Sequence, residues 1–175
     1  LLFCSGALGL TYEICWSRQL SAWLGHGERA AALTLALFFV GMAGGYAFAA
    51  RWLRTSRRPL RAYVICELMI AGCALCVPWL NQYPNLHAHL WLALLPPAFA
   101  MGASLPFIMQ TVSAAQGSVS RAYAYHLLGA TLGSFIATFF LIERVGLWNT
   151  TYLAAALSTA CGVAAFFLEE REDTT

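Results

Sequence analysis

Long apolar runs separated by short polar segments dominate the pattern of this chain. Six such runs lie at about residues 1–24, 29–53, 60–80, 88–114, 121–142 and 147–168. About twenty apolar residues in a helix cross the hydrocarbon core of a bilayer. The alternating pattern of a membrane barrel does not occur in these runs. We therefore predict an all-α integral membrane domain of six transmembrane helices over residues 1–168, followed at 169–175 by an acidic cytoplasmic tail or the start of a linker.

One cationic loop predicts the orientation of the whole domain. The segment RWLRTSRRPLR between the second and third runs contains half of the ten basic residues: Arg51, Arg54, Arg57, Arg58 and Arg61. Such loops stay on the cytoplasmic side of a membrane. We therefore expect both termini to be cytoplasmic, with short outside turns at 25–28, 81–87 and 143–146 and a second inside loop at 115–120. The expected location is the bacterial inner membrane.

Composition agrees with a membrane domain. The chain is 60% hydrophobic and only 10% charged, whereas about a quarter of the residues in a soluble domain are charged. The net charge of +2 and the lack of a basic face beyond the loop give no indication of a nucleic-acid partner. The first run contains Glu13 and Arg18, which are unusual in the apolar core of a signal peptide, so we interpret it as a true span.

The sequence contains no recognisable catalytic motif. A phosphate-binding glycine loop, a nucleophile elbow, a metal-ligand cluster and a methyl-donor motif are all absent. The pair Cys73 and Cys76 has the C-x-x-C spacing but lies in an apolar span, where packing is the favoured interpretation. His87 and His89 are two residues apart and do not share a helix face, which disfavours a metal site. We therefore predict no catalytic residue, cofactor or metal within these residues.

Four ionisable residues lie inside the predicted spans: Glu13, Arg18, Glu67 and His126. Such a group is costly in lipid unless it is paired or faces a wet cavity. Glu13 and Arg18 are about 140° apart around a helix, too far for a good mutual ion pair, so each is expected to have a partner on another helix. These residues form either a polar substrate pathway or a buried network that fixes helix packing. A lone histidine at the position of His126 is typical of a packing or interface residue, with proton transfer as the alternative.

Two stripes of small residues predict close helix packing. The second run contains Gly41, Gly45 and Ala49 at four-residue intervals, and the fifth run contains Gly129, Gly133 and Ala137. Such stripes allow another helix backbone to approach closely. The two runs hold the same place in each half of the chain if the six spans form two groups of three. This favours an inverted three-plus-three repeat, like one half of a major-facilitator transporter.

Several segments, taken in order, resemble the membrane domain of the fused major-facilitator/spermidine-synthase-like proteins. The most specific is Tyr12-Glu13-x-x-Trp16-Ser17-Arg18. The others are Ser5-Gly-Ala, the Gly41 and Gly45 helix with Arg57-Arg58-Pro59, Glu67-Leu68, Met101-Gly-Ala-Ser-Leu-Pro106, Tyr123-Ala with Leu128-Gly129-Ala-x-Leu-Gly133, and Phe140-Leu-Ile142 with Gly146-Leu147. This chain has His126 and Glu143 where the family commonly has Asn and Pro, and its 45–61 loop lacks the acidic residue of true facilitators.

The resemblance implies a role in polyamine chemistry. In that family a cytoplasmic Rossmann-like domain related to spermidine synthase, which uses decarboxylated S-adenosylmethionine, commonly follows the membrane helices. Any transferase activity would lie in that domain. The membrane helices would anchor or supply it, with Glu13 and Glu67 attracting a cationic amine. The alternatives are a non-catalytic subunit of a larger membrane complex and a small homodimeric transporter. Besides the bilayer, the expected partners are another subunit, a second copy or a fused soluble domain.

Overall fold

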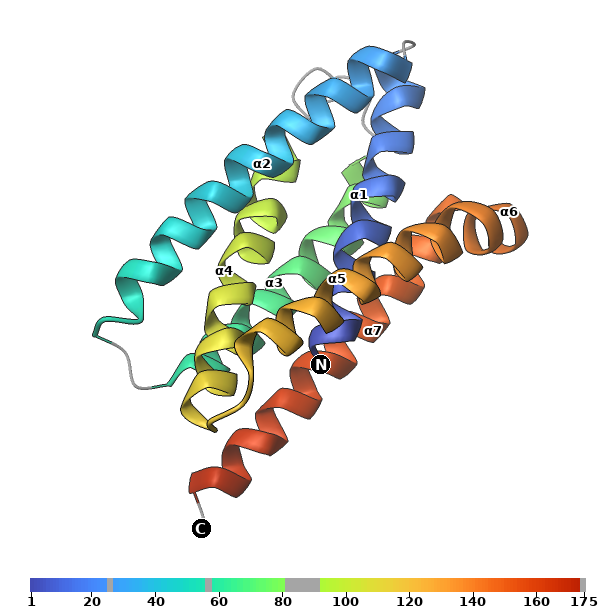
Figure 1. Ribbon diagram of the computed structural model, residues 1–175. Coiled ribbons are helices and arrows are strands. Elements are labelled where there is room, and N and C mark those ends of the chain that lie inside the picture. The colour runs from blue at the N-terminus through green and yellow to red at the C-terminus, as the bar shows by residue number, and fades with distance from the viewer. Residues whose placement is uncertain (25–26, 56–57, 81–91, 174–175) are drawn as a thin grey trace.

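The computed structural model describes residues 1–24, 27–55, 58–80 and 92–173, and in these ranges it is helical without any strand (Figure 1). This confirms the predicted all-α class. The elements are α1 (Leu2–Leu24), α2 (Gly27–Trp52), α3 (Pro59–Leu80), α4 (Leu95–Ala114), α5 (Val119–Ile136), the π-helical segment η2 (Ala137–Leu141), α6 (Ile142–Val145) and α7 (Leu147–Asp173).

Within the described residues, five helical segments are long and apolar enough to cross a membrane: Gly27–Trp52, Pro59–Val77, Leu92–Ala114, Val119–Val145 and Leu147–Glu169. They correspond to the second to sixth predicted spans, and residues 88–91 of the predicted fourth span lie outside the described part. The first predicted span is the helix α1, but it is not among the five. Its polar residues, including Glu13 and Arg18, lower its mean hydropathy, so its crossing stays a prediction.

Local sequence explains where the helices of the second half begin and end. Pro96 and Pro97 follow the first residue of α4, where the missing backbone donors are tolerated. The side chain of Ser118 accepts a hydrogen bond from the Arg121 backbone amide and caps the start of α5. Gly146, with φ of 87°, separates α6 from α7 in a backbone conformation that favours glycine. One continuous helical segment runs from Val119 to Val145 through α5, the π-helical η2 and α6.

The helices pack in a defined set of pairs. The most extensive contacts are between α2 and α4, between α1 and α5, and between α3 and both α7 and α4. Gly41 and Gly45 lie directly against the α4 backbone around Ala98 and Phe99, and Gly129 and Gly133 lie against α1. Each glycine stripe therefore lies at one of the closest helix crossings of the bundle.

Aromatic side chains fill the core between α1, α2 and α3. The rings of Tyr12 and Trp16 stack with their centroids 5.1 Å apart, and Trp16 contacts Phe38 at 5.7 Å. Tyr63 on α3 is also fully buried. Many large apolar side chains on the outside are exposed, including Phe39, Tyr125 and others on α2, α5 and α7. An apolar exterior around a packed core is typical of an integral membrane protein.

The ends of the described helices alternate between the two ends of the bundle. Figure 1 shows the C-terminal end of α2, the turn between α4 and α5, and the C-terminal end of α7 at the same end. At that end α7 continues through residues 169–173 as a helix, where the sequence predicts a tail or linker. Glu169 is buried there, and its Oε1 atom lies 3.0 Å from Nε of Arg61 at the start of α3.

Candidate polar cavity in the helix bundle

The Tyr-Glu-x-x-Trp segment of α1 presents two different faces. Tyr12 and Trp16 are four residues apart, so they share one face of the helix and both point into the core. Glu13 is one position further around and is half-buried. The aromatic pair therefore packs in the core, and Glu13 lines an internal cavity.

This cavity is the main polar feature inside the bundle. Its volume is about 210 Å³, and residues of α1, α2, α3, α4, α5 and α7 line it. Most of the lining is apolar, with Phe38, Met42 and Met101 among the side chains. The polar side chains are few: Ser5, Tyr12, Glu13, Tyr46, Glu67, Ser104, His126 and Ser158. An apolar cavity with a few convergent polar groups is the usual form of a small-molecule site.

Glu67 is one of the polar residues that line the cavity. Its residue is only 2% exposed, and Ser5 on α1 donates a hydrogen bond of 3.3 Å to its Oε1 atom. The hydroxyl groups of Tyr63 and Ser158 also lie near this carboxylate. Tyr12 donates to Ser158 at 3.3 Å, which ties α1 to α7 beside the cavity. Three different helices therefore direct hydroxyl groups toward Glu67.

In the part of the chain that the structure describes, neither carboxylate of the cavity, Glu13 or Glu67, forms an ion pair. The partner on another helix that is expected for Glu13 is not an ion-pair partner among these residues. Hydroxyl groups solvate a carboxylate but do not neutralise it. A cavity whose carboxylates form no ion pair among the described residues is suited to a positively charged ligand.

His126 stands at the rim of the same cavity. Its side chain is partly buried, and Nδ1 lies 3.3 Å from the backbone carbonyl oxygen of Leu2 on α1. The ring also stacks near Tyr123, with centroids 6.5 Å apart. Because Nδ1 faces a carbonyl acceptor, the protonated Nδ1 tautomer fits this contact. His126 therefore joins α5 to α1 and at the same time faces the cavity that contains Glu67.

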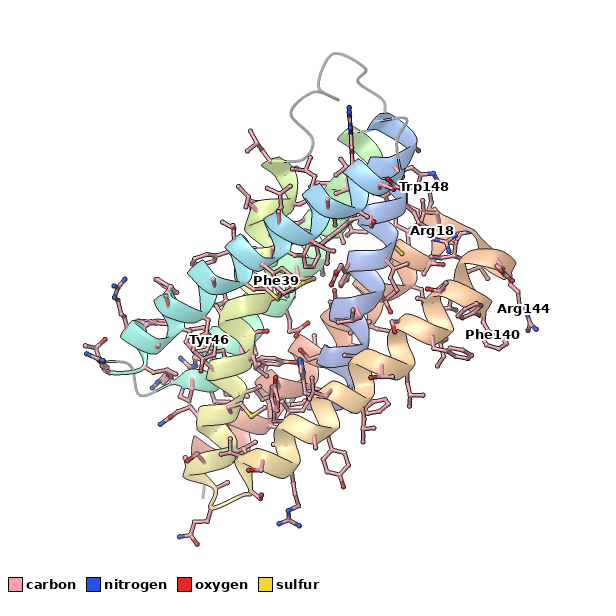
Figure 2. The ribbon with its side chains drawn as sticks, turned by 45° about the horizontal axis from the view of Figure 1, so that its top comes forward. Arg18, Phe39, Tyr46, Phe140, Arg144 and Trp148 are labelled. Atoms are coloured by element: carbon pink, nitrogen blue, oxygen red, sulfur yellow. The ribbon has the colours of Figure 1, made fainter. Side chains whose placement is uncertain are left out.

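Arg18 lies apart from the Glu67 cavity. It is exposed on the C-terminal half of α1 (Figure 2) and lines a second pocket between α1 and α2 together with Glu13, Ser17 and Thr34. The structure thus brings Glu13, Glu67 and His126 to one cavity and places Arg18 at another. Glu13 lines both.

Sequence reasoning did not single out the hydroxyl groups of this region as site residues. Ser5, Tyr12 and Ser104 occur only as parts of the segments that resemble the family, and Ser158 lies outside those segments. A usable signal was present, because hydroxyl side chains in apolar spans commonly bond across helices. What the sequence does not reveal is which of these hydroxyls lies near which carboxylate.

The basic loop and the cysteines do not line this cavity. Arg51, Arg54 and Arg58 are exposed near the connection after α2, and Arg57 lies outside the described residues. The cysteines, including Cys73 and Cys76, are free thiols. No cluster of three potential metal ligands occurs among the residues that the structure describes, and His87 and His89 lie outside them.

Comparisons with protein-family models, with curated proteins and with solved structures found no match to this chain.

Proposed function

We propose that this chain is a six-helix membrane domain that binds an organic amine in the cavity around Glu67, and that it anchors or supplies a cytoplasmic spermidine-synthase-like domain. The single observation that supports amine binding most directly is the buried Glu67 carboxylate, which faces a cavity and has no ion-pair partner among the described residues. A charged carboxylate in the interior of a membrane domain costs about 2.5–3.5 kcal/mol on insertion scales. An ammonium group bound beside it would offset that cost.

The dimensions and lining of the cavity also favour a small linear amine. A water molecule occupies about 30 Å³ in the liquid, so a cavity of about 210 Å³ can hold a chain of several heavy atoms. Glu67 and Glu13 offer two carboxylates for two ammonium groups, and the side chains of Met42 and Met101 offer apolar surface for the methylenes between them. The family resemblance of the Tyr12–Arg18 segment points to the same ligand class.

An inverted repeat is part of the proposal. Exchanging α1 with α4, α2 with α5 and α3 with α7 converts the α1–α5 crossing into the α4–α2 crossing. Under this exchange, the contact of Phe3 with Gly129 corresponds to the contact of Phe99 with Gly45. The contact of Gly6 with His126 corresponds to the contact of Gly102 with Met42. In both crossings the two contacts are three residues apart on each helix. The helices α1 and α4 run in opposite directions (Figure 1), as an inverted repeat requires.

Amine binding can be tested on the purified chain in lipid nanodiscs. The probes are spermidine and putrescine, with uncharged 1,4-butanediol as the matched control ligand, and the readout is calorimetry. We expect both amines to bind the native chain and the diol not to bind. Glu67→Gln, which keeps the side-chain volume, should weaken amine binding by at least about tenfold, the loss of one charge-assisted hydrogen bond.

The exposed Glu143 provides the matched control variant. Glu143→Gln removes the same charge outside the cavity and should leave amine affinity unchanged. Equal amine affinity in native chain and a folded Glu67→Gln variant would refute the proposal. So would the absence of amine binding by the native chain. Either result would favour the non-catalytic subunit, in which the polar groups only fix helix packing.

The exchange pattern of contacts specifically favours a second candidate, a homodimeric transporter. A six-helix bundle with such a repeat corresponds to half of a facilitator, and two copies would complete it. Uptake of radiolabelled putrescine into proteoliposomes tests this function. If the chain transports amines, we expect the uptake to depend on Glu67. Binding without uptake would leave the amine-supplying membrane domain as the function.

A further inference from the structure

A second pocket lies between α1 and α2 and shares Leu10 and Glu13 with the Glu67 cavity. Its volume is about 280 Å³. Its polar side chains are Glu13, Ser17 and Arg18 from α1 and Thr34 from α2. The rest of the lining is aliphatic. The pocket therefore contains one acidic group, one basic group and two hydroxyl groups.

The two charged groups of this pocket do not neutralise each other. Among the described residues, no ion pair joins Glu13 to Arg18. Their five-residue spacing puts them about 140° apart around the helix and about 7.5 Å apart along it, which exceeds the reach of an i,i+4 pair. Both nevertheless line the same pocket. A ligand with a positive and a negative group at its two ends would meet a complementary charge at each.

Thr34 provides an independent indication of a ligand. Threonine hydroxyls inside helices commonly donate to the carbonyl one turn earlier. Six of them do so here: Thr11, Thr111, Thr131, Thr150, Thr151 and Thr159. Thr34 is 1% exposed, yet its Oγ1 atom has no hydrogen-bond partner within the described residues. A buried hydroxyl without a partner is unfavourable, and this one borders the pocket.

We propose that the pocket of Glu13, Ser17, Arg18 and Thr34 binds a small zwitterion of the amino-acid type. The ammonium group of the ligand lies at Glu13, its carboxylate at Arg18, and Thr34 Oγ1 supplies a further hydrogen bond. Arg18 gives this pocket a selectivity that the acidic Glu67 cavity lacks, because a plain amine leaves the guanidinium without a partner. The site is separate from the proposed amine site but shares Glu13 with it.

The test compares ligands that differ only in charge. The native chain in nanodiscs is titrated with the zwitterions 4-aminobutyrate and 6-aminohexanoate, and with butylamine, butyrate, hexylamine and hexanoate as matched single-charge controls. We expect at least one zwitterion to bind about tenfold or more tightly than both of its single-charge controls, as one additional charge-assisted contact provides. The proposal is overturned if neither zwitterion binds more tightly than its single-charge controls, or if neither zwitterion binds at all.

Variants separate this site from the Glu67 cavity. Arg18→Gln should remove the preference for the zwitterion, whereas Arg144→Gln, which changes an exposed arginine over the Phe140 ring (Figure 2), should preserve it. Thr34→Val, nearly identical in shape, should weaken zwitterion binding by about three- to tenfold through loss of one hydrogen bond. Glu67→Gln should leave zwitterion affinity unchanged while it weakens putrescine binding. An unchanged preference in folded Arg18→Gln, or loss of zwitterion binding in Glu67→Gln, overturns the assignment.

Discussion

Gly45 on α2 lies directly against the backbone carbonyl of Phe99 on α4, and the two helices leave no room for a side chain between them. Gly129 on α5 has the same relationship to the carbonyl of Phe3 on α1. In a bilayer, where apolar side chains gain little by leaving lipid, such close backbone contact is a main source of helix association. The two crossings are therefore expected to be sensitive to the smallest added side chain.

Gly45→Ala should destabilise the bundle. The added methyl group forces backbone against backbone, and overpacking of this kind costs about 1–3 kcal/mol. The thermal unfolding midpoint in detergent should therefore fall, and Gly129→Ala should lower it by a similar amount. Gly72→Ala is the control, because a Cβ at Gly72 meets no atom within 4 Å. A Gly45→Ala midpoint equal to that of Gly72→Ala would contradict the observed crossing.

The alternation of loops predicts which residues face the cytoplasm. Single cysteines at the exposed positions Thr55, Gln116 and Asn149, in a background without native cysteines, report the side of each connection. An impermeant maleimide applied to intact cells should label Thr55→Cys and Gln116→Cys only after permeabilisation. Asn149→Cys should react at once. Labelling of all three from the same side would contradict the predicted topology.

The crossing of α1 needs its own measurement, because α1 is not among the five described segments that are long and apolar enough to cross a membrane. A protease-sensitive tag placed before Leu1 should be protected in intact cells, as is also expected for the Thr55 position. A single cysteine at the exposed Gly27 should react from outside. Digestion of the tag from outside would mean that α1 does not cross the bilayer.

The pair of Arg61 and Glu169 should couple the start of α3 to the end of α7. Its Nε–Oε1 distance is 3.0 Å, but the Arg61 side chain is 46% exposed, so solvent screens the attraction. We therefore expect a coupling free energy of about 0.5–1 kcal/mol in a double-mutant cycle of Arg61→Gln and Glu169→Gln. High salt should reduce it. No measurable coupling at low salt would show that the contact does not stabilise the bundle.

The long apolar runs of the sequence were enough to predict the helical class and nearly all helix positions. The predicted second run at 29–53 agrees with α2 (Gly27–Trp52), and the sixth begins at residue 147 as α7 does. The end of α7 is different. Residues 169–173 are polar and suggest a tail, but the structure continues the helix to Asp173, and buried Glu169 contacts Arg61 there. Arg61 and Glu169 are more than a hundred positions apart in the sequence.

The candidate site was predictable only in part. Glu67 and Glu13 are conspicuous because charged residues are rare in apolar spans. Ser5, Tyr12 and Ser158 are ordinary residues for a membrane helix, and the sequence gives no reason to place them around Glu67. Thr34 likewise looks like any other threonine of the chain. Its missing hydrogen bond becomes visible only when the positions of all the neighbouring acceptors are known.

The sequence by itself determined the helices, most of their ends and the positions of the small residues. These depend on interactions within about one helical turn and on the transfer of each segment into lipid, which is a property of that segment alone. Only the tertiary structure decided that the stripe of Gly45 meets α4, that the stripe of Gly129 meets α1, and that Ser5 reaches Glu67. Those pairings depend on the fit between surfaces of helices distant in sequence, and no local pattern specifies that fit.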